Sequence, residues 1–415
     1  MGHGHHHHSA ATSLRTPPEV RRRLFFALVP FVVATIVGIV LLWPGETKDL
    51  GTSDSLRAPQ YAATVSEAEV GGCEPPEQQA NFVCSVVTVR VEAGPDEGLT
   101  FEFNHLAGPE SRRFGAGDDV IVARATTEAG EPNYYFVDFD RRFPLLLLAL
   151  IFAVVVVALS RLHGLLSLVG VIVSIGFLIV FVMPAILEGS NPLAVSIVAS
   201  AAIMFLTLYL AHGVNARTTT AILGTMAALA LTGALAIIFV NFGRFTGFGS
   251  EEASFLQLSA EQVNLQGLLL GGIIIGTLGV LDDVTITQAS AVWELRLANP
   301  AYGVRDLYRA GIRIGRDHVA STVNTLVLAY AGASLPLLIL FSVSNRGFVD
   351  VVNAEVVAEE VVRTLVGSIG LVASVPMTTF LAAAVVASSH SSEAKPKDER
   401  PRWEREWRND DEESP

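Results

Sequence analysis

Long apolar runs alternate with polar segments along most of this chain. A helix needs about 20 mainly apolar residues to cross the roughly 30 Å hydrocarbon core of a bilayer, at about 1.5 Å per residue. Eight runs approach or exceed that length, which predicts an all-α polytopic membrane protein with about eight transmembrane helices. The predicted spans cover residues 24–43, 143–160, 163–187, 191–212, 216–241, 266–288, 321–343 and 361–387, the last seven forming a membrane domain over 143–390.

Residues 44–142, between the first two spans, follow a different pattern. Short stretches such as FVCSVVTVRVEA and LTFEFNHLA alternate apolar and polar residues, and turn sequences such as AGPDEG separate them. Alternation with a period of two is typical of half-buried strands. About five such strands predict a small all-β domain, either a sandwich or a partly open barrel of the OB type.

The charges between the spans predict one orientation in the membrane. Cytoplasmic loops carry an excess of Lys and Arg. Arg21, Arg22 and Arg23 precede the first span, further arginines lie in loops on the same side, and acidic residues dominate the other side. We therefore expect both termini in the cytoplasm and an extracytoplasmic β domain. The tails 1–23 and 391–415, the first rich in His and the second of mixed charge, are expected to be disordered.

Composition narrows the class of protein and of partner. The chain of 415 residues is 51% hydrophobic and has a formal net charge of −13, so nucleic acid is not an expected partner. Its two cysteines, Cys73 and Cys84, both fall in the predicted β domain. Outside the cytoplasm they are expected to form a disulfide, and the alternative is two free thiols.

The N-terminal sequence MGHGHHHHSA contains a cluster of histidines. Neutral imidazoles bind borderline metals such as zinc and nickel. The cluster is therefore either a metal site, an expression tag or a solvated tail, and the solvated tail is the favoured interpretation; no other cofactor is expected. Its members are His3, His5, His6, His7 and His8.

The polar segment 301–318, AYGVRDLYRAGIRIGRDH, has helical periodicity. Apolar and small residues share one helical face, and four arginines share another. We expect an amphipathic helix on the cytoplasmic surface, with its arginines directed toward anionic lipid headgroups; an ordinary positively charged loop is the alternative. The arginines are Arg305, Arg309, Arg313 and Arg316.

Asp282 and Asp283, in the sequence GVLDDVTITQAS, interrupt an otherwise apolar run. Charged residues in a span are costly unless they are paired or hydrated, so these are candidates for a functional site. Helical spacing puts Thr287 and Ser290 on the face of Asp283 and Thr285 on the face of Asp282, which favours Asp283 as the pocket-facing member. Adjacent carboxylates in a poorly solvated site can hold a proton or a cation. The alternative is that the span ends before them and both are solvated.

The next predicted span begins with a second polar stripe at a similar depth. It includes His318, Ser321 and Asn324. Two neighbouring spans with polar stripes at one depth predict a shared hydrophilic pocket, in which His318 would exchange protons near neutral pH. For each Ser or Thr taken singly, helix packing through the hydroxyl is the alternative.

The last predicted span adds secondary candidates. Glu359 and Arg363 are four residues apart and are expected to form a surface ion pair, with Glu360 directed toward the mouth of a cavity. Thr378 and Thr379 lie at the depth of the other polar stripes.

Three stretches of the sequence together resemble one family. GTLGVLDDVTITQAS, DHVASTVNTLVLAYAGASLP and EEVVRTLVGSIGLVASVPMTT are similar to the YibE/F family of bacterial multi-span membrane proteins, and the likeness covers residues 140–390. The resemblance implies a bacterial inner-membrane protein of a kind often described as a transporter, and it supplies no substrate. The order of one helix, an outer domain and a helix block is also similar to SecD/SecF and related RND transporters, which carry protons on a membrane aspartate. This chain differs from those transporters in its extra spans and smaller outer domain.

These observations lead to two hypotheses of function. The sequence has no nucleotide-binding loop and no HExxH, GxSxG or CxxC motif, so no enzymatic activity is expected. The leading hypothesis is a secondary transporter or permease for a small solute or ion, coupled to protons or cations by Asp282 and Asp283. The alternative is a non-transporting envelope or protein-export factor whose 44–142 domain binds a protein partner. The lipid bilayer surrounds the helices in both cases.

Overall fold

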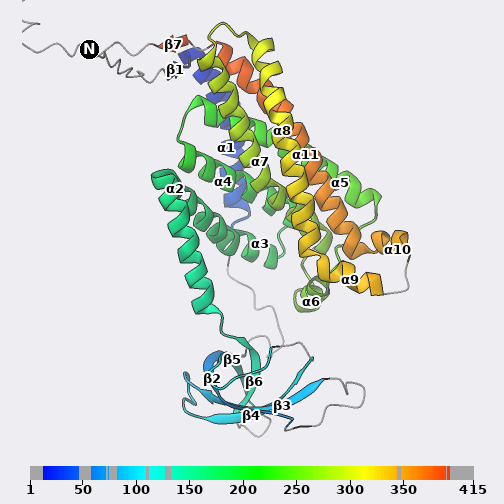
Figure 1. The fold of residues 1–415 in the computed structure, drawn as a ribbon. Coiled ribbons are helices and arrows are strands. Elements are labelled where there is room, and N and C mark those ends of the chain that lie inside the picture. The colour runs from blue at the N-terminus through cyan, green and yellow to red at the C-terminus, as the bar shows by residue number, and fades with distance from the viewer. Residues whose placement is uncertain are drawn as a thin grey trace, which may run out of the picture. The chain divides into compact units, whose positions relative to one another are not determined.

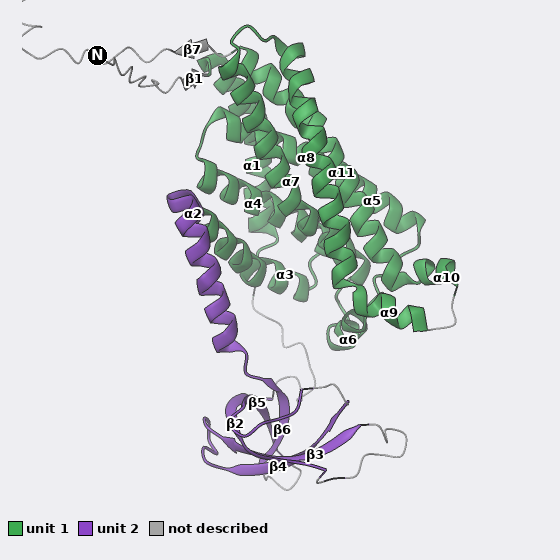
Figure 2. Cartoon of the chain, in the orientation of Figure 1, with its two compact units in different colours: residues 1–48, 166–415 green, residues 49–165 purple. Residues whose placement is uncertain are grey.

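The computed structural model describes residues 13–45, 58–71, 73, 82–108, 112–126, 132–343, 347–388 and 390–392. Two compact units make up the chain (Figure 2): unit 1 contains residues 1–48 and 166–415, and unit 2 contains residues 49–165. Unit 2 holds a β domain and the first part of helix α2 (Arg142–Phe177), whereas unit 1 is almost entirely helical. The N-terminal histidines lie outside the described residues, as does nearly all of the tail after residue 388.

The β domain of unit 2 is one antiparallel sheet of five strands. The strand order is β4-β3-β2-β5-β6, so the first strand of the domain lies at the centre of the sheet. The register shifts between Val65 and Glu67 on β2, where a bulge bends the sheet. The strands are β2 (Gln60–Val70), β3 (Val83–Val91), β4 (Thr100–Ala107), β5 (Asp119–Thr126) and β6 (Pro132–Phe139).

Aromatic side chains join the two edge strands of this sheet. Phe101 on β4 stacks on Tyr134 of β6 with ring centroids 5.5 Å apart, and Phe103 stacks on Phe136 at 5.6 Å. The sheet therefore curls until its edges meet through side chains, which makes it a nearly closed barrel. Of the two architectures expected from the sequence, the partly open barrel agrees with this arrangement.

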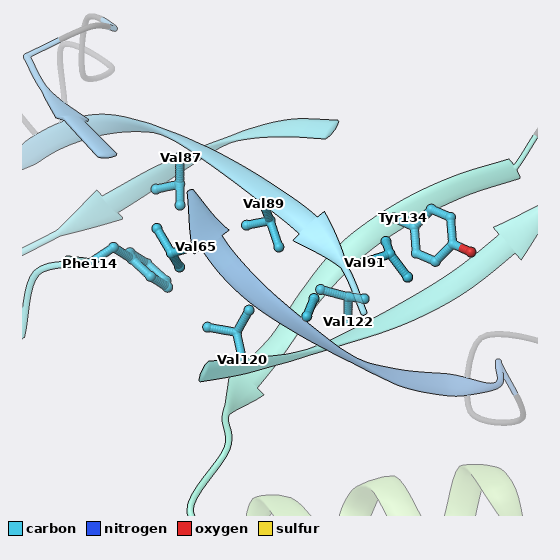
Figure 3. Close-up of a cluster of buried hydrophobic side chains, with 9 residues drawn as sticks. Val65, Val87, Val89, Val91, Phe114, Val120, Val122 and Tyr134 are labelled. Atoms are coloured by element: carbon cyan, nitrogen blue, oxygen red, sulfur yellow. The ribbon is translucent and has the colours of Figure 1, made fainter. Parts of the chain in front are cut away.

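Valines fill most of the interior of the barrel (Figure 3). On β3 the buried side chains alternate with more exposed neighbours, so Val87, Val89 and Val91 all point inward and are fully buried. Val120 on β5 is also fully buried, and Phe114, from the loop before β5, completes the cluster. β-branched side chains suit a pleated surface, so the residues that predicted strands also form the core.

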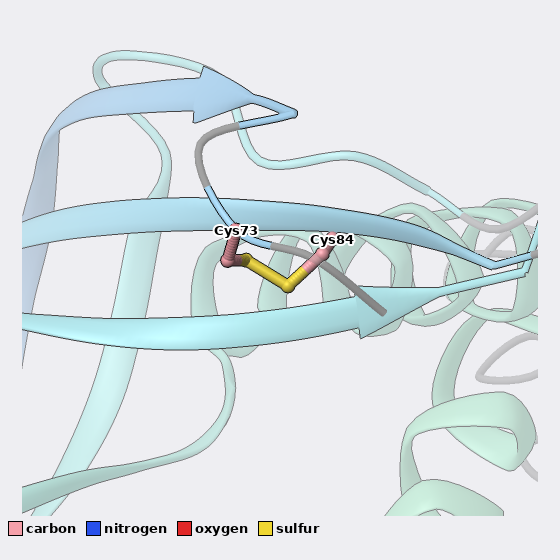
Figure 4. Close-up of a disulfide and its surroundings, with 2 residues drawn as sticks. All are labelled: Cys73 and Cys84. Atoms are coloured by element: carbon pink, nitrogen blue, oxygen red, sulfur yellow. A yellow bond between two sulfur atoms is a disulfide. The ribbon is translucent and has the colours of Figure 1, made fainter. Parts of the chain in front are cut away.

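A disulfide between Cys73 and Cys84 ties the loop after β2 to the start of β3 (Figure 4). Their Cα atoms are 5.3 Å apart, and the bridge closes a loop with a sequence separation of 11. Gly71 begins the loop with a φ of +86° and donates its N–H to the Cys84 carbonyl at 2.8 Å. Glycine adopts this left-handed conformation without a steric penalty, so the turn can reach the bridge.

Unit 1 is a bundle of helices in which α5, α7 and α11 pack closely on one another and α8 packs against α7 and α11 (Figure 1). A short strand pair, β1 (Ser13–Arg15) with β7 (His390–Ser392), joins the two ends of the chain. A π-helical turn, Leu178–Val182, separates α2 from α3. The remaining helices are α1 (Pro18–Leu41), α3 (Met183–Leu187), α4 (Pro192–His212), α5 (Ala216–Phe242), α6 (Glu251–Ser259), α7 (Leu265–Ala298), α8 (Val304–Ala333), α9 (Leu335–Val343), α10 (Phe348–Asn353) and α11 (Glu355–Ala387).

Asparagine side chains define where three of the long helices begin. The side chains of Asn191, Asn215 and Asn264 accept hydrogen bonds from backbone N–H groups three residues later, at the starts of α4, α5 and α7. The first N–H groups of a helix have no partner inside it, and an asparagine at the N-cap satisfies one of them. The asparagine N-caps thus determine the residues at which these three apolar helices begin.

Within the described residues, six helices, or seven if the bent pair α8–α9 is one span, are long and apolar enough to cross a membrane. The sequence predicted about eight. Relative to seven, the additional predicted span lies in residues 142–187. Those residues form one 46-residue stretch, which would be about 69 Å long if straight, more than twice the thickness of a hydrocarbon core. The stretch has a break at Arg161, where φ is 51° and ψ is −126°. The predicted spans 143–160 and 163–187 lie on either side of this break.

Helix α8 differs from the expected arrangement. The sequence predicted a surface helix over 301–318 and a separate span over 321–343, but α8 is continuous through residue 318 and the break comes at Ser334, where α9 bends away by 59°. The apolar face of the predicted surface helix is covered by protein, because Gly311 packs against Thr379 and Gly315 against Val375. Its burial between helices, which the sequence pattern does not specify, keeps the segment in the bundle.

Candidate functional site

Glycines opposite hydroxyl side chains bring the central helices of unit 1 together. At three crossings among α5, α7 and α11, a glycine leaves the space that a Thr side chain from the neighbouring helix fills. In a membrane, where apolar side chains gain little by leaving lipid, such close approach is a main source of helix association. The pairs are Gly224 with Thr378, Gly370 with Thr232, and Gly367 with Thr277.

Several of these hydroxyls have a hydrogen-bond partner within their own helix. Thr232 donates to the Ala228 carbonyl at 2.9 Å, and Thr277 donates to the Ile273 carbonyl at 2.6 Å. Such bonds satisfy a buried hydroxyl locally. For these two threonines, the packing interpretation is therefore sufficient.

Asp282 lies in a different environment, where α7 meets α5. Its carboxyl group lies beside the Thr225 hydroxyl of α5. The Thr225 and Thr285 hydroxyl oxygens are 2.6 Å apart, and Thr285, which is fully buried, reaches the Asp282 carbonyl at 3.2 Å. Among the described residues, the Oδ1 atom of Asp282 is buried and has no hydrogen-bond partner. A carboxyl group with one free, buried oxygen is unusual and can accept a proton.

Asp283 points away from this cluster. Asp283 and Thr287 are both exposed, and Ser290 is half-buried. The structure thus reverses the preference for Asp283 that helical phase suggested. Neighbouring residues on a helix point about 100° apart, so the two aspartates cannot share one pocket, and the position of Thr225 decides that Asp282 faces the interior.

The polar stripe on α8 does not join Asp282 in one pocket. Ser321 and Asn324 are exposed, and His318 is half-buried. The Nε2 atom of His318 is buried and has no hydrogen-bond partner in the described part of the chain. Across the described ranges, no hydrogen bond or ion pair links either aspartate to these α8 side chains, so the expected shared pocket is absent from the contacts.

Gln288 is a buried polar residue to which the sequence interpretation assigned no role. Its side-chain nitrogen donates to the Gly311 carbonyl of α8 at 2.8 Å and to the Thr379 hydroxyl of α11 at 2.7 Å. It therefore links α7, α8 and α11. Gln288 shares a helical face with Leu281 and Val284, and this position in the sequence could have predicted that it is buried. Thr225 was also missed, and the run of threonines early in α5 was the available signal.

Residues near the start of α11 pair differently from the prediction. Arg363 lies 3.4 Å from Glu360 as an ion pair, whereas Glu359 packs against Gly249. The spacing of four favoured Glu359, but the loop before α6 occupies that carboxyl group. Glu360 also lines a cavity of about 270 Å³ between α8, α9 and α11.

Nearby, Glu355 holds the loop that follows α5. Its carboxylate accepts from the backbone N–H and hydroxyl of Thr246, at 2.6 and 2.7 Å, and from the N–H of Gly247 at 3.0 Å. Within the described ranges, no group of three or more His, Cys, Asp or Glu side chains is placed to hold a metal ion. The acidic end of α11 is therefore occupied by loop contacts.

Comparison with known proteins places the helical region in a family. A family model described as YibE/F-like protein matches residues 148–388, which is more than half of the chain and includes α4, α5, α7, α8 and α11. The searches of curated proteins and of solved structures found no match. The matched region contains the Asp282 cluster and excludes the β domain. The chain therefore belongs to the YibE/F-like protein family.

Proposed function

We propose that this protein is a secondary transporter or permease of the bacterial inner membrane, in which Asp282 carries a proton during the transport cycle. One observation carries the proposal: the Asp282 carboxyl group lies between membrane-capable helices with one buried, unpartnered oxygen. An ionisable group at such a depth is costly and usually has a function. A proton suits the cluster better than a metal cation, because Asp283 points elsewhere and hard cations require more oxygen ligands.

The hydrogen bonds around Asp282 are compatible with both protonation states. An ionised Asp282 accepts from the Thr225 hydroxyl, which in turn accepts from Thr285. A protonated Asp282 donates to the Thr225 oxygen, Thr225 then donates to the Thr285 oxygen 2.6 Å away, and Thr285 donates to the backbone carbonyl of Asp282 at 3.2 Å. Hydroxyl groups allow this exchange because they donate and accept. A site that keeps its bonds in both states suits a proton carrier.

Eight spans agree best with the contacts inside unit 1. Gly45, after α1, donates its N–H to Glu188, after α3, so these two positions lie at the same end of the unit. Gly170 packs against Thr207 near the far end of α4, so the stretch after residue 166 starts at the opposite end. These contacts support one further crossing between residues 45 and 166, which we assign to residues 142–165 by their length and apolar character. Because β1 precedes α1 and β7 follows α11, their pairing supports an even number of spans.

Charge and the disulfide both support the proposed orientation in the membrane. Arginines gather in the loops on the side of the termini, which favours a cytoplasmic position for both ends. Eight spans then put the β domain outside the cytoplasm, where a disulfide such as Cys73–Cys84 persists. The proposed transport function requires no enzymatic activity.

Proton flux into proteoliposomes tests the proposal. Vesicles containing the purified protein and a pH-sensitive dye would be given a pH gradient together with panels of metal cations and small organic solutes. We expect Asp282→Asn to lower solute-dependent proton flux to the level of protein-free vesicles. Asp283→Asn removes the same charge from the same helix and should retain most of the flux. Wild-type flux in Asp282→Asn, measured for a solute that the wild type transports, would contradict the proposal.

The second candidate function is a non-transporting envelope factor. The observation that favours it is the independent core and disulfide of the β domain, which suit a module that binds a protein partner. Replacing residues 58–140 with a flexible linker distinguishes the two. If that variant loses its function in cells while Asp282→Asn behaves as the wild type in every assay, the envelope factor is the better account.

A further inference from the structure

A cavity of about 940 Å³ lies at the end of unit 1 where α1 and α5 begin and α4 ends. This volume is within the range of small-molecule sites, about 300–1,000 Å³. Two neighbouring arginines of α1, Arg21 and Arg22, line it, together with polar groups of Tyr209, Asn215 and Thr219. The cavity therefore combines positive charge with neutral hydrogen-bonding groups.

The described residues offer no acidic partner for the charge in this cavity. Within the described residues, no acidic side chain lies close enough to Arg21 or Arg22 to form an ion pair, and no acidic residue lines the cavity. The Tyr209 and Thr219 hydroxyls are 3.0 Å apart and bond to each other, so they form a neutral wall. Two unpaired guanidinium groups facing such a space favour an anion with several acceptor oxygens, such as a phosphate group.

A second cavity continues from the first along the helices. It has a volume of about 630 Å³ and is lined almost entirely by apolar side chains of α1, α2 and α4. Tyr209 lines both cavities, so they meet at this residue. Among the apolar lining residues are Val32, Ile36, Ile39, Phe177 and Leu206. A charged chamber that continues into an apolar one matches a molecule with an anionic head and long hydrocarbon chains.

We propose that these two cavities together bind one anionic phospholipid. Its phosphate group lies against Arg21 and Arg22, and its acyl chains follow α1 toward Ile39. Basic pockets between transmembrane helices are known sites for anionic headgroups. The bound lipid would fill the space between α1 and α4, and so hold α1 against the rest of the bundle. This inference does not depend on transport or on the role of Asp282.

Native mass spectrometry of the full chain in mild detergent, after equilibration with phosphatidylglycerol, tests the charged part. We expect the wild type to retain one lipid, and the double variant Arg21→Gln/Arg22→Gln to bind it about 30-fold more weakly, because both guanidinium groups that face the phosphate are lost. Arg23→Gln is the matched control, because Arg23 follows on the same helix and does not line the cavity. Equal losses in the control and the double variant would overturn the proposal, as would full retention by the double variant.

Two further measurements distinguish a lipid from a free anion or a nonspecific amphiphile. Phosphatidylcholine, which has no net charge, should bind the wild type far less than phosphatidylglycerol; equal binding overturns the role of charge. Excess inorganic phosphate should leave the long-chain lipid bound, and its complete displacement would assign the cavity to a free anion instead. Ala202→Phe places a ring in the apolar cavity and should weaken long-chain more than short-chain phosphatidylglycerol. Equal weakening of both would refute the acyl-chain part.

Discussion

The β domain and the helical unit are packed by different kinds of side chain. In the barrel, the interior consists of valines and aromatic rings, among them Val87, Val89 and Phe114. In the bundle, the closest helix crossings are made by glycines opposite threonines, such as Gly370 with Thr232. The barrel is stabilised by large side chains that fill its core. The bundle is stabilised by glycines, whose lack of a side chain lets neighbouring helices approach closely.

The difference follows from the two solvents. In water, burying apolar surface contributes about 25 cal/mol per Å², so large apolar side chains hold a small domain together. In lipid, the surroundings are already apolar and this term largely disappears, which leaves close packing and hydrogen bonding between helices. Removing volume should therefore damage the barrel most, and adding volume should damage the bundle most.

The largest effect is expected from Phe114→Ala in the barrel. Phe114 packs against Phe103, Phe136 and Phe139, and its loss should lower the free energy of unfolding of the β domain by about 3–5 kcal/mol. Hydrogen exchange at the β3 amides of the full chain measures this change. Phe31→Ala removes the same ring from an exposed position on α1 and should leave exchange in both units nearly unchanged.

Removing the disulfide should have the next largest effect. A bridge that closes a loop of this length constrains the unfolded chain, so Cys73→Ser with Cys84→Ser should cost the β domain about 3 kcal/mol. The same exchange measurement applies, with and without a reductant. If reductant destabilises the double variant as much as the wild type, the bridge is not the cause.

In the bundle, Gly370→Ala adds a single methyl group at a crossing of α11 and α5. The added Cβ would overlap the Thr232 hydroxyl, and such overpacking costs about 1–3 kcal/mol. The midpoint of thermal unfolding in detergent should fall, and Thr232→Ala in the same chain should restore part of it. Gly279→Ala on α7 meets no atom within 4 Å and serves as the control, which is expected to be neutral or stabilising.

The smallest expected effect is a dependence of the stability of the β domain on pH. Burial against Phe114 lowers the pKa of His105 below its unfolded value of about 6.5. The folded state then binds fewer protons than the unfolded state, so stability is highest above about pH 6.5 and decreases as the pH falls through that value. Hydrogen bonds from Arg124 and Tyr134 lower the pKa of Asp96, whose contribution is lost only when the pH falls below about 3.9. His105→Phe should remove the first decrease and leave the second.

The parts of the structure that depend on local pattern were predictable from the sequence. Runs of apolar residues located the long helices, and alternation located the strands of the barrel. Arg161 illustrates the same point, because the sequence divided the chain there into two apolar runs and the backbone leaves helical geometry at that residue. These features follow from periodicity, which the chain carries residue by residue.

The direction of single polar side chains was not predictable in this way. Helical phase fixes the angle between Asp282 and Asp283 but not which of them faces the adjoining helices. Thr225, whose position shows that Asp282 faces inward, lies on another helix, α5. The ion pair of Arg363 similarly depended on the loop at Gly249, which occupies Glu359. Contacts between distant segments settle such questions, and one sequence contains no direct record of them.

Helix α11 follows α5, α7 and α8 in the chain, and this order has a consequence for synthesis. This helix closes the crossings with α5, α7 and α8, and it supplies Thr378 and Thr379. During translation, Gln288 is made before Thr379, the α11 hydroxyl that accepts its hydrogen bond. The faces of α5, α7 and α8 that α11 covers therefore stay uncovered until α11 has been made, and a chain truncated before α11 would lack all of these contacts.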